Sequence, residues 1–275
     1  MIGFAVAFFA AAASNAVVLQ PVVNMYSKPT EDADVVSQAI YGANVAIVEQ
    51  RPGWARIRTA DEYTGWTPAA ALRAGAPYAA GANAAEVSSL FAHIYREPSV
   101  TRHAPSITLP FEARVELAAA ESTPGWFQVR LADGRDGWVQ AGDIALHAAP
   151  LSTAEMLALS KRFLGLPYTW GGTSSYGYDC SGFTQMLERR RGVRMPRDAQ
   201  PQAEWSSVAP VARQAVEPGD LLYFGSSEKH ITHTGMYLGD GKFINATTYR
   251  SPMVRIDELD DPHWTQLLVA IRRVK

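Results

Sequence analysis

The sequence predicts an α+β protein in which two small all-β barrels precede a larger mixed domain. At 275 residues the chain is too long for one small module, because domains usually hold about 100–150 residues. One segment repeats without gaps in the first half, and after residue 148 the apolar periodicity changes from alternating to helical. With 47% hydrophobic and 19% charged residues, the chain can build packed cores. We therefore predict domains at residues 17–78, 79–148 and 149–275.

The repeat occupies residues 52–67 and again residues 124–139. Each copy has the pattern W-x-x-[IV]-R, then a turn, then G-W-[TV]. In each copy two apolar side chains alternate with polar neighbours, as in half-buried strands: Trp54 and Ile57, then Trp126 and Val129. Short strands of this kind close into small barrels without a long free edge.

The first sixteen residues form an apolar segment with small residues at its end, Ser14, Asn15 and Ala16. This pattern is typical of a secretory signal peptide, and export to the periplasm, cell wall or medium would follow. Alternatively, the segment is an apolar helix that stays on a cytoplasmic protein, since a basic start is absent. It is short for a membrane span, so no stable membrane span is expected.

Charge and cysteine content exclude several classes of function. The net charge is −2 and the longest basic run is the triplet at residues 189–191, so no nucleic-acid partner is expected, and the triplet is predicted to lie at an exposed helix end. A single cysteine excludes an intrachain disulfide and a multi-cysteine metal site. No metal cluster, phosphate loop or cofactor signature is present in the sequence, so we expect no metal and no cofactor. We expect a monomer.

Cys180 is the single cysteine, and the residues around it indicate a reactive position. A polar, glycine-containing loop precedes it, and Phe183, Met186 and Leu187 mark a helix that follows. Cys180 is therefore predicted at a helix N-terminus, where the helix dipole and unpaired N–H groups favour the nucleophilic thiolate. The alternative interpretation, a buried structural thiol, would leave Cys180 inert.

A nucleophilic thiol needs a base, and six histidines are candidates. Only His230 and His233 lie in the third domain away from an acidic surface turn. His233 is predicted to open a strand over residues 233–238, whereas His230 is predicted in a loop. A rigid strand positions an imidazole better than a loop does, so His233 is the candidate base.

Asn245 lies on the following strand, beyond a Gly-Asp-Gly turn at residues 239–241. A two-residue loop at 240–241 would turn Asn245 to the face opposite His233, because side chains alternate along a strand. A three-residue loop with Gly241 left-handed pairs Gly235 with Asn245 and puts Asn245 on the face of His233. A catalytic role for Asn245 requires the second register. Otherwise Asn245 is a turn former at the strand end.

The third domain resembles the NlpC/P60 cysteine peptidases over residues 152–275. The ordered motifs that carry the resemblance are P-Y-x-W-G-G, D-C-S-G-F, M-P-R-D-A-x-x-Q, P-G-D-L-L-Y-F, H-T-G-M-Y-L-G and F-I-N-A. The two repeats resemble bacterial SH3 (SH3b) domains. Together, this architecture is similar to the YkfC-like γ-D-glutamyl-L-diamino acid endopeptidases, which cut stem peptides of peptidoglycan. The resemblance implies a papain-like catalytic fold.

The resemblance also implies roles for particular residues. Cys180 would be the nucleophile, His233 its base, and Tyr168 a part of the oxyanion hole beside the Cys180 amide. Many members have histidine at the position of Asn245, although an amide also orients the imidazole in papain-like triads. Substrate recognition is carried over to the following residues: Trp170, Asp179, Ser181, Arg197 and Asp198.

Within that set, Arg197 suits the free α-carboxylate of D-Glu, and Asp179 suits the ammonium of a free L-Ala. Ala199 replaces a common serine, which removes one substrate hydrogen bond. The repeats differ where Tyr63 in the first copy corresponds to Arg135 in the second. By the resemblance, Tyr63 closes the cleft over the amino end of the peptide; otherwise it is an exposed hairpin aromatic.

The predicted function is hydrolysis of the bond between γ-D-Glu and the diamino acid, diaminopimelate or lysine, in small stem peptides with a free N-terminal L-Ala. A second hypothesis is a wall-binding protein whose SH3b pair acts while the third domain is catalytically silent. A third is an amidase or acyltransferase on the same fold. The intact pair of Cys180 and His233 argues against a silent domain.

Overall fold

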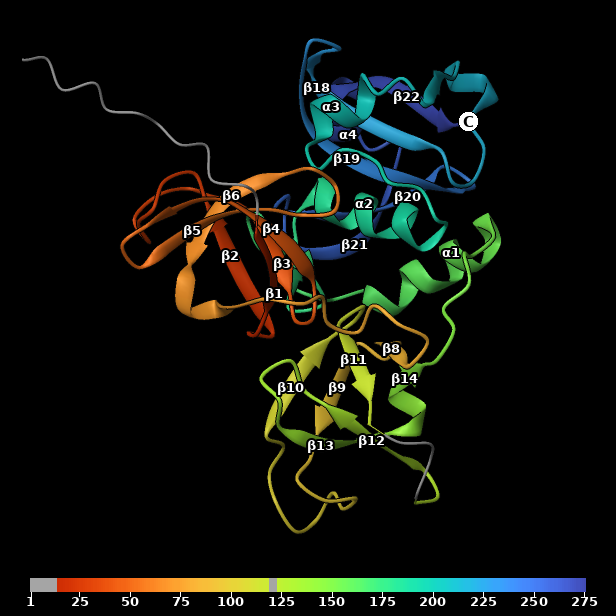
Figure 1. The fold of residues 1–275 in the computed structure, drawn as a ribbon. Helices are drawn as coiled ribbons and strands as arrows, with labels where there is room; N and C mark the ends of the chain where they lie inside the picture. Colours follow the sequence, from red (N-terminus) through yellow and green to blue (C-terminus); the bar gives the residue numbers. More distant parts are fainter. Residues whose placement is uncertain (1–13, 119–122) are drawn as a thin grey trace, which may run out of the picture.

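Three domains follow one another along the chain and contact each other pairwise (Figure 1). The computed structural model describes residues 14–118 and 123–275. Residues 1–13 of the predicted N-terminal segment therefore lie outside the described residues. Ser14, Asn15 and Ala16 already belong to strand β1, which includes the end of that segment. Among the described residues, no helix has the length and apolarity needed to cross a bilayer.

The first domain is one curved sheet with the strand order β3-β2-β6-β5-β4-β1-β7. Its inner face is a closed apolar core in which Val18, Met25 and Ile57 are fully buried. The strands are β1 (Ser14–Val18), β2 (Val22–Tyr26), β3 (Val35–Ile40), β4 (Asn44–Arg51), β5 (Trp54–Arg58), β6 (Thr64–Pro68) and β7 (Leu72–Ala74), with a short 3-10 turn at Ala69–Ala71.

The second domain has a five-stranded sheet, β13-β12-β11-β8-β14, and a separate β9-β10 pair. Its core is continuous with residues of the first domain, including Val17 and Tyr41. The strands are β8 (Ala84–Val87), β9 (Phe91–Ile94), β10 (Ile107–Pro110), β11 (Arg114–Leu117), β12 (Trp126–Arg130), β13 (Asp136–Gln140) and β14 (Ile144–Ala145), with a 3-10 turn at Ala141–Asp143.

The two repeats adopt the same local structure. Trp54 packs edge-on against Tyr26 with 5.7 Å between ring centroids, and Trp126 packs against Tyr95 in the same way at 5.6 Å. The next apolar residue in each copy is fully buried: Ile57 and Val129. In each barrel the repeated tryptophan thus packs on a tyrosine while the aliphatic residue fills the core, which confirms the prediction of two SH3-like units.

The third domain contains a six-stranded antiparallel sheet, β17-β22-β18-β19-β20-β21, with α2 packed against β19 and β20 on one face and α4 contacting β18. Its strands are β15 (Thr173–Ser174) and β16 (Gly177–Tyr178), which form a small hairpin, and β17 (Val208–Pro210), β18 (Leu221–Ser227), β19 (His230–Gly239), β20 (Lys242–Thr247), β21 (Met253–Glu258) and β22 (Leu268–Val274) in the main sheet. The helices are α1 (Thr153–Ser160), α2 (Cys180–Arg190), α3 (Ala199–Ala203) and α4 (Pro262–Leu267), with 3-10 turns at Lys161–Phe163 and Arg213–Ala215.

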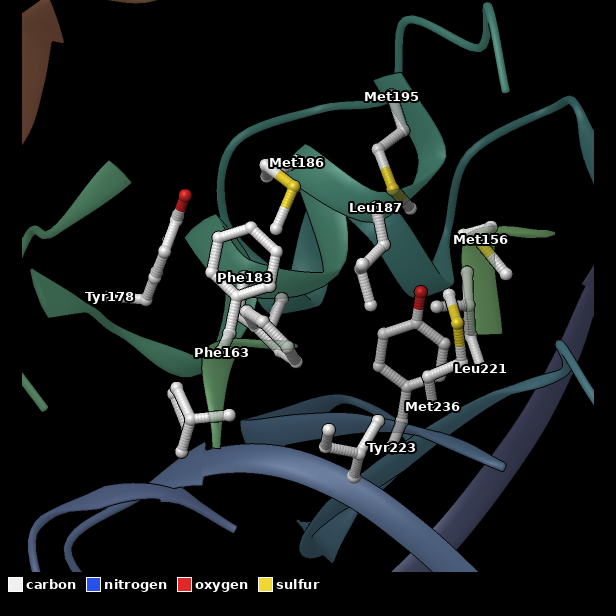
Figure 2. Packing of buried hydrophobic residues seen from close by; sticks show 14 of the residues in the cluster. Met156, Phe163, Tyr178, Phe183, Met186, Leu187, Met195, Leu221, Tyr223 and Met236 are labelled. Carbon is white, nitrogen blue, oxygen red and sulfur yellow. The ribbon is translucent and has the colours of Figure 1, made fainter. Parts of the chain in front are cut away.

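Helix α1 begins after Ser152, which forms a reciprocal capping box with Glu155. Helix α2 is held against the sheet by one apolar cluster (Figure 2). Phe183, Met186 and Leu187 of α2 are fully buried there and face Met236 of β19. This packing fixes the orientation of the whole helix, and with it the position of the residue at its N-terminus.

The basic triplet lies at the end of α2, as predicted, but only Arg189 is exposed there, at 40%, and two of its three residues contact another domain. Arg189 pairs with Glu112 of the second barrel at 2.6 Å, and Arg190 pairs with Glu86 of the same barrel. Arg191 instead pairs within the helix, with Glu188 at 3.0 Å. Glu86 and Glu112 lie far from the triplet in sequence, and no local pattern identifies them as its partners.

The first barrel contacts the third domain near the start of α2. Thr173 donates its backbone N–H to Gln38 at 3.2 Å, and Gln185 donates to Asp61 at 2.8 Å. Gly171 has a left-handed φ of 73°, and a Cβ there would lie 2.7 Å from the side chain of Val35. The loop before Cys180 therefore packs directly on the first barrel.

Candidate active site

Cys180 is the first residue of α2, which confirms its predicted place at a helix N-terminus. Asp179 caps the helix, its Oδ1 accepting the Gly182 N–H at 2.7 Å. A Cβ on Gly182 would lie 2.2 Å from the Gly172 carbonyl oxygen, so the D-C-S-G turn requires glycine for this close approach. The local sequence thus places the thiol at a tightly packed corner between helix and loop.

The surroundings of the thiol do not favour the thiolate. Cys180 is 8% exposed, and burial followed by the nearby Asp179 raises its pKa to about 12. Hydrogen bonds from the Thr234 and Ser181 backbone and the charge of Arg197 oppose this shift without cancelling it. The helix terminus alone therefore does not ionise Cys180, and the thiol needs a base to take its proton.

His233 lies in the middle of β19, because the strand starts at His230 rather than at His233 as predicted. The imidazole of His233 stacks on the indole of Trp264 at 5.0 Å and lies 5.7 Å from the Phe224 ring. Burial by these groups lowers the pKa of His233 from 6.5 to about 4, against the opposing effects of Asn245 and Asp257. His233 is therefore a neutral imidazole, able to accept a proton.

Thr234 connects the two groups, since its backbone N–H reaches the Cys180 sulfur and His233 precedes it in β19. Helix α2 packs against β19 along this stretch. The thiol therefore lies beside the backbone of β19 at the residue that follows His233.

Asn245 lies on the same face as His233, with its Oδ1 2.9 Å from the imidazole Nε2. The pairing of Met236 with Ile244 gives the register that the catalytic hypothesis requires. The turn itself differs from the prediction. Gly239 pairs with Lys242 across two left-handed residues, and an irregularity between Tyr237 and Gly239 shifts the register by one residue.

The approach of Asn245 to β19 depends on a second glycine. A Cβ at Gly235 would lie 3.1 Å from the Asn245 Cβ and 2.7 Å from the ring of Phe243. The H-T-G sequence therefore provides both the imidazole and the space beside it for the amide.

Two residues that the sequence analysis did not single out lie behind Asn245. Its Nδ2 donates to Oδ2 of Asp257 at 3.1 Å, and Arg255 pairs with the other carboxylate oxygen at 2.6 Å. Both lie on β21, where they alternate with the inward-facing Val254 and Ile256. That alternation was visible in the sequence and could have placed Asp257 on the face of Asn245.

Tyr168 and Trp170 lie on the loop that precedes Cys180. The pKa of Tyr168 is raised by burial and then by Cys180 and Asp179, so its hydroxyl lies within the electrostatic reach of the thiol. Trp170 is 71% exposed, so its indole is free to cover a bound molecule but contributes nothing to the core.

Asp179, Ser181 and Arg197 form one buried cluster, and this changes two expectations. Arg197 is 2% exposed and donates to both carboxylate oxygens of Asp179, at 2.6 and 3.0 Å, to Ser181 at 2.9 Å and to Ser37 of the first barrel at 3.1 Å. The guanidinium is thus engaged within the protein, which argues against the expected role in binding a substrate carboxylate. Equally, its charge neutralises Asp179, the carboxylate expected to bind an ammonium.

Tyr63 reaches the third domain from the turn between β5 and β6. Its hydroxyl donates to Oδ2 of Asp198 at 3.0 Å, and burial followed by Asp198 raises the pKa of Tyr63 to about 12. The corresponding residue of the second barrel, Arg135, pairs with Asp133 in its own turn at 2.7 Å. The two repeats are therefore used differently, and Tyr63 is a contact between domains rather than an exposed aromatic.

Asp198 differs from Asp179 in its partners. Within residues 14–118 and 123–275, no arginine, lysine or histidine forms an ion pair with Asp198. Burial raises the pKa of Asp198, and the nearby carboxylates of Asp179 and Asp61 add to this effect, against the opposing effects of the Tyr63 hydrogen bond and the Arg197 charge. Asp198 thus has the Tyr63 hydroxyl as its direct partner and Arg197 as a charge nearby.

Comparison with known proteins identifies both kinds of domain. The NlpC/P60 family matches residues 165–273, and the bacterial dipeptidyl-peptidase SH3 domain matches residues 25–72. A gamma-D-glutamyl-L-lysine dipeptidyl-peptidase from Bacillus cereus is 29% identical over 254 residues, covering 86% of this chain and 74% of its own length. Dipeptidyl-peptidase 6 from Lysinibacillus sphaericus is 28% identical over 263 residues, covering 90% and 93%.

The fold is also similar to solved structures. The crystal structure of an NlpC/P60 family protein from Bacillus cereus superposes with a TM-score of 0.82 at 23% identity, covering 95% of this chain and 99% of that one. At that identity the likeness shows the fold, including the arrangement of the N-terminal barrels and the third domain. The chain therefore carries an NlpC/P60 domain behind an SH3-like all-β region, and it is a hydrolase of the peptidase class.

Proposed function

We propose that this protein is a cysteine endopeptidase that cuts the bond between γ-D-Glu and the diamino acid in small peptidoglycan stem peptides with a free N-terminal L-Ala. The observation that carries the proposal is the hydrogen bond from Tyr63 to Asp198. It closes one side of the site with a residue of the first barrel. A site closed in this way fits the end of a short peptide better than an uninterrupted wall strand.

In the proposed reaction, the Cys180 thiol gives its proton to His233 while the sulfur attacks the γ-carbonyl carbon of D-Glu. The oxyanion is stabilised by the Cys180 backbone N–H, which has no partner within the helix, and by the Tyr168 hydroxyl. The imidazolium then protonates the departing diamino acid nitrogen, and the C–N bond breaks. Water, deprotonated by His233, resolves the thioester and releases L-Ala-D-Glu.

The amino end of the substrate is assigned to Asp198 rather than to Asp179. An ammonium group beside Asp198 would gain a charge-assisted hydrogen bond there, and the Tyr63 hydroxyl would remain in place as a second polar contact. Asp61 would add a favourable field, whereas the charge of Asp179 is neutralised by Arg197. An acetylated amino end carries no charge and adds bulk, so it would lose this interaction.

The names of the relatives support the same substrate class. Two of them, from Bacillus cereus and Bacillus subtilis, are called gamma-D-glutamyl-L-lysine dipeptidyl-peptidases. An enzyme that releases a dipeptide must measure a fixed distance from the amino end to the scissile bond. In this proposal the Asp198 carboxylate binds the amino end, the Cys180 thiol attacks the scissile bond, and the distance between them selects a dipeptide.

The test is a matched pair of peptides, L-Ala-γ-D-Glu-L-Lys and its N-acetylated form, with products identified by mass spectrometry. We expect release of L-Ala-D-Glu from the free peptide and a large loss of kcat/KM with the acetylated one. Equal cleavage of both peptides would contradict the free amino end. Binding to wall sacculi without cleavage of either peptide would support a wall-binding protein instead.

A further inference from the structure

We propose that Asp257, held by Arg255, is a positioning residue that fixes the orientation of the Asn245 amide and thereby selects the reactive tautomer of His233. The inference rests on the proposed function, because it concerns how the candidate base is prepared. Three side chains on β21, β20 and β19 form a continuous series of contacts: Asp257 to Asn245 at 3.1 Å, and Asn245 to His233 at 2.9 Å.

The Asn245 amide has one donating end and one accepting end, and its neighbours decide which way it lies. The oxygens of Asp257 face the guanidinium of Arg255 at 2.6 Å on one side and Asn245 on the other. A carboxylate paired with a guanidinium only accepts hydrogen bonds, so Nδ2 of Asn245 must point toward it. The backbone oxygen of Arg255, 3.4 Å from the same Nδ2, requires the same orientation.

The orientation of the amide then decides the state of the imidazole. With Nδ2 directed at Asp257, Oδ1 faces Nε2 of His233 and can only accept a hydrogen bond. Nε2 therefore carries the hydrogen, and Nδ1 is left with its lone pair. If the amide were reversed, Nδ2 would donate to Nε2, the hydrogen would move to Nδ1, and the imidazole could no longer accept the thiol proton there.

Burial makes this selection effective. Asn245 is fully buried, Asp257 is 7% exposed, and the indole of Trp264, 2% exposed, stacks on the imidazole. Water that could replace Asp257 as an acceptor is thus largely excluded, and a reversed amide would place Oδ1 against the Asp257 carboxylate, two acceptors with no hydrogen between them. Asn245 alone does not fix which end of its amide faces His233. The Asp257 carboxylate fixes that orientation.

The experiment is a reciprocal exchange at the two positions, assayed as kcat/KM for L-Ala-γ-D-Glu-L-Lys. Asp257→Asn removes the fixed acceptor, and we expect a loss of about 10-fold or more, comparable to other losses of an outer orienting partner. Asn245→Asp places two carboxylates side by side, and we expect a larger loss. The double exchange Asn245→Asp with Asp257→Asn restores an acceptor toward His233 and a donor behind it, so activity should recover above that of Asn245→Asp alone.

A matched control is Glu258→Gln, since Glu258 lies next to Asp257 on β21 but is exposed and pairs with Lys242 at the surface. It should leave kcat/KM unchanged. In the double exchange the new carboxylate at position 245 should also move the acid limb of the pH profile upward. The other titratable groups that act on His233 are Asp179 at the start of α2 and His263 on α4, and both are unchanged in these variants, as is Arg255, the partner of Asp257.

Nitrogen NMR of the labelled imidazole gives a second readout that does not depend on turnover. The parent protein should show the hydrogen on Nε2 of His233, and Asp257→Asn should show a mixture of tautomers with thermal unfolding little changed. Parent-like activity, pH profile and tautomer in Asp257→Asn would overturn the inference while Cys180→Ala remained inactive. Activity surviving in Cys180→Ala would instead overturn the proposed function.

Discussion

The hydroxyl of Tyr63 donates a 3.0 Å hydrogen bond to Asp198, joining a turn of the first barrel to the N-cap of α3 across 135 residues of sequence. The same barrel reaches Arg197 through Ser37, so adjacent residues of the third domain are each held from outside it. In the proposed function, the barrel is therefore part of the substrate site as well as a neighbouring module. On that proposal, the amino-end specificity depends on the domain arrangement.

Tyr63→Phe should raise KM for peptides with a free amino end by about 10-fold, which corresponds to about 1.4 kcal/mol, and should change kcat little. The reason is that the hydroxyl helps to hold Asp198 in place but takes no part in bond breaking. Steady-state kinetics with the free tripeptide measures the effect. Tyr176→Phe is the matched control, because its hydroxyl bonds only to the backbone of Thr108 at an exposed site. An unchanged KM in Tyr63→Phe would remove Tyr63 from the substrate site.

Asp198→Asn should weaken binding of the free peptide more than Tyr63→Phe does, because it removes the charge that the ammonium group faces. The N-acetylated peptide, which lacks that charge, should be nearly insensitive to the substitution. Comparing kcat/KM for the two peptides with each variant isolates the charge term. If Asp198→Asn discriminated between the two peptides as strongly as the parent protein does, the ammonium site would have to lie elsewhere.

The acid limb of kcat should lie well below the ordinary histidine pKa. Burial lowers the pKa of His233 from 6.5 to about 4, so the imidazole stays neutral, and able to accept a proton, as the pH falls through 6.5. Activity is then lost only as the pH approaches about 4. A profile of kcat, rather than of KM, separates this from protonation of Asp198, whose pKa is raised. A midpoint near 6.5 would show that burial of His233 has no such effect.

Alkylation of Cys180 by iodoacetamide should be slow near neutral pH and should accelerate as the pH rises. Burial raises the thiol pKa to about 12, so only a small fraction of the free enzyme carries the thiolate. The rate is measured from intact mass over a pH series. A plateau of fast alkylation from about pH 4 to 8 would instead indicate a preformed thiolate–imidazolium pair.

The second barrel should contribute to stability through the end of α2. Glu112→Gln removes a buried carboxylate that pairs with Arg189, and we expect the free energy of unfolding to fall by about 1–3 kcal/mol. Urea denaturation measures this, with Glu62→Gln as the control because its pair with Arg58 is exposed. Equal stability of the two variants would mean that the contact of α2 with the second barrel contributes no more than a surface pair.

Local patterns in the sequence predict much of this arrangement. The repeat predicts equivalent positions for Trp54 and Trp126 in their two barrels. The apolar residues after Cys180 predict a helix that begins at the thiol. The face of Asn245 followed from strand alternation once the catalytic register was assumed, but a β-bulge reaches that register with a shorter turn. Bulges depend on tertiary packing, which a short sequence window does not contain.

The remaining features are contacts between residues distant in sequence. The sequence around Arg197 is the same whether this residue binds a substrate or neutralises Asp179. Only its burial in the structure decides between the two roles. The basic triplet of α2 likewise needed knowledge of Glu86 and Glu112, about 80 to 100 residues away. Such pairs depend on how the domains dock, and one sequence gives no local signal of docking.

The substitution Cys180→Ala, which removes the sulfur, tests most directly the central claim that Cys180 is the nucleophile. The parent protein and Cys180→Ala are incubated with L-Ala-γ-D-Glu-L-Lys, and products are followed by mass spectrometry after thermal unfolding has shown that both are folded. The parent should release L-Ala-D-Glu and lysine, and Cys180→Ala should release neither. Release of the dipeptide by Cys180→Ala at a rate near that of the parent would contradict Cys180 as the nucleophile.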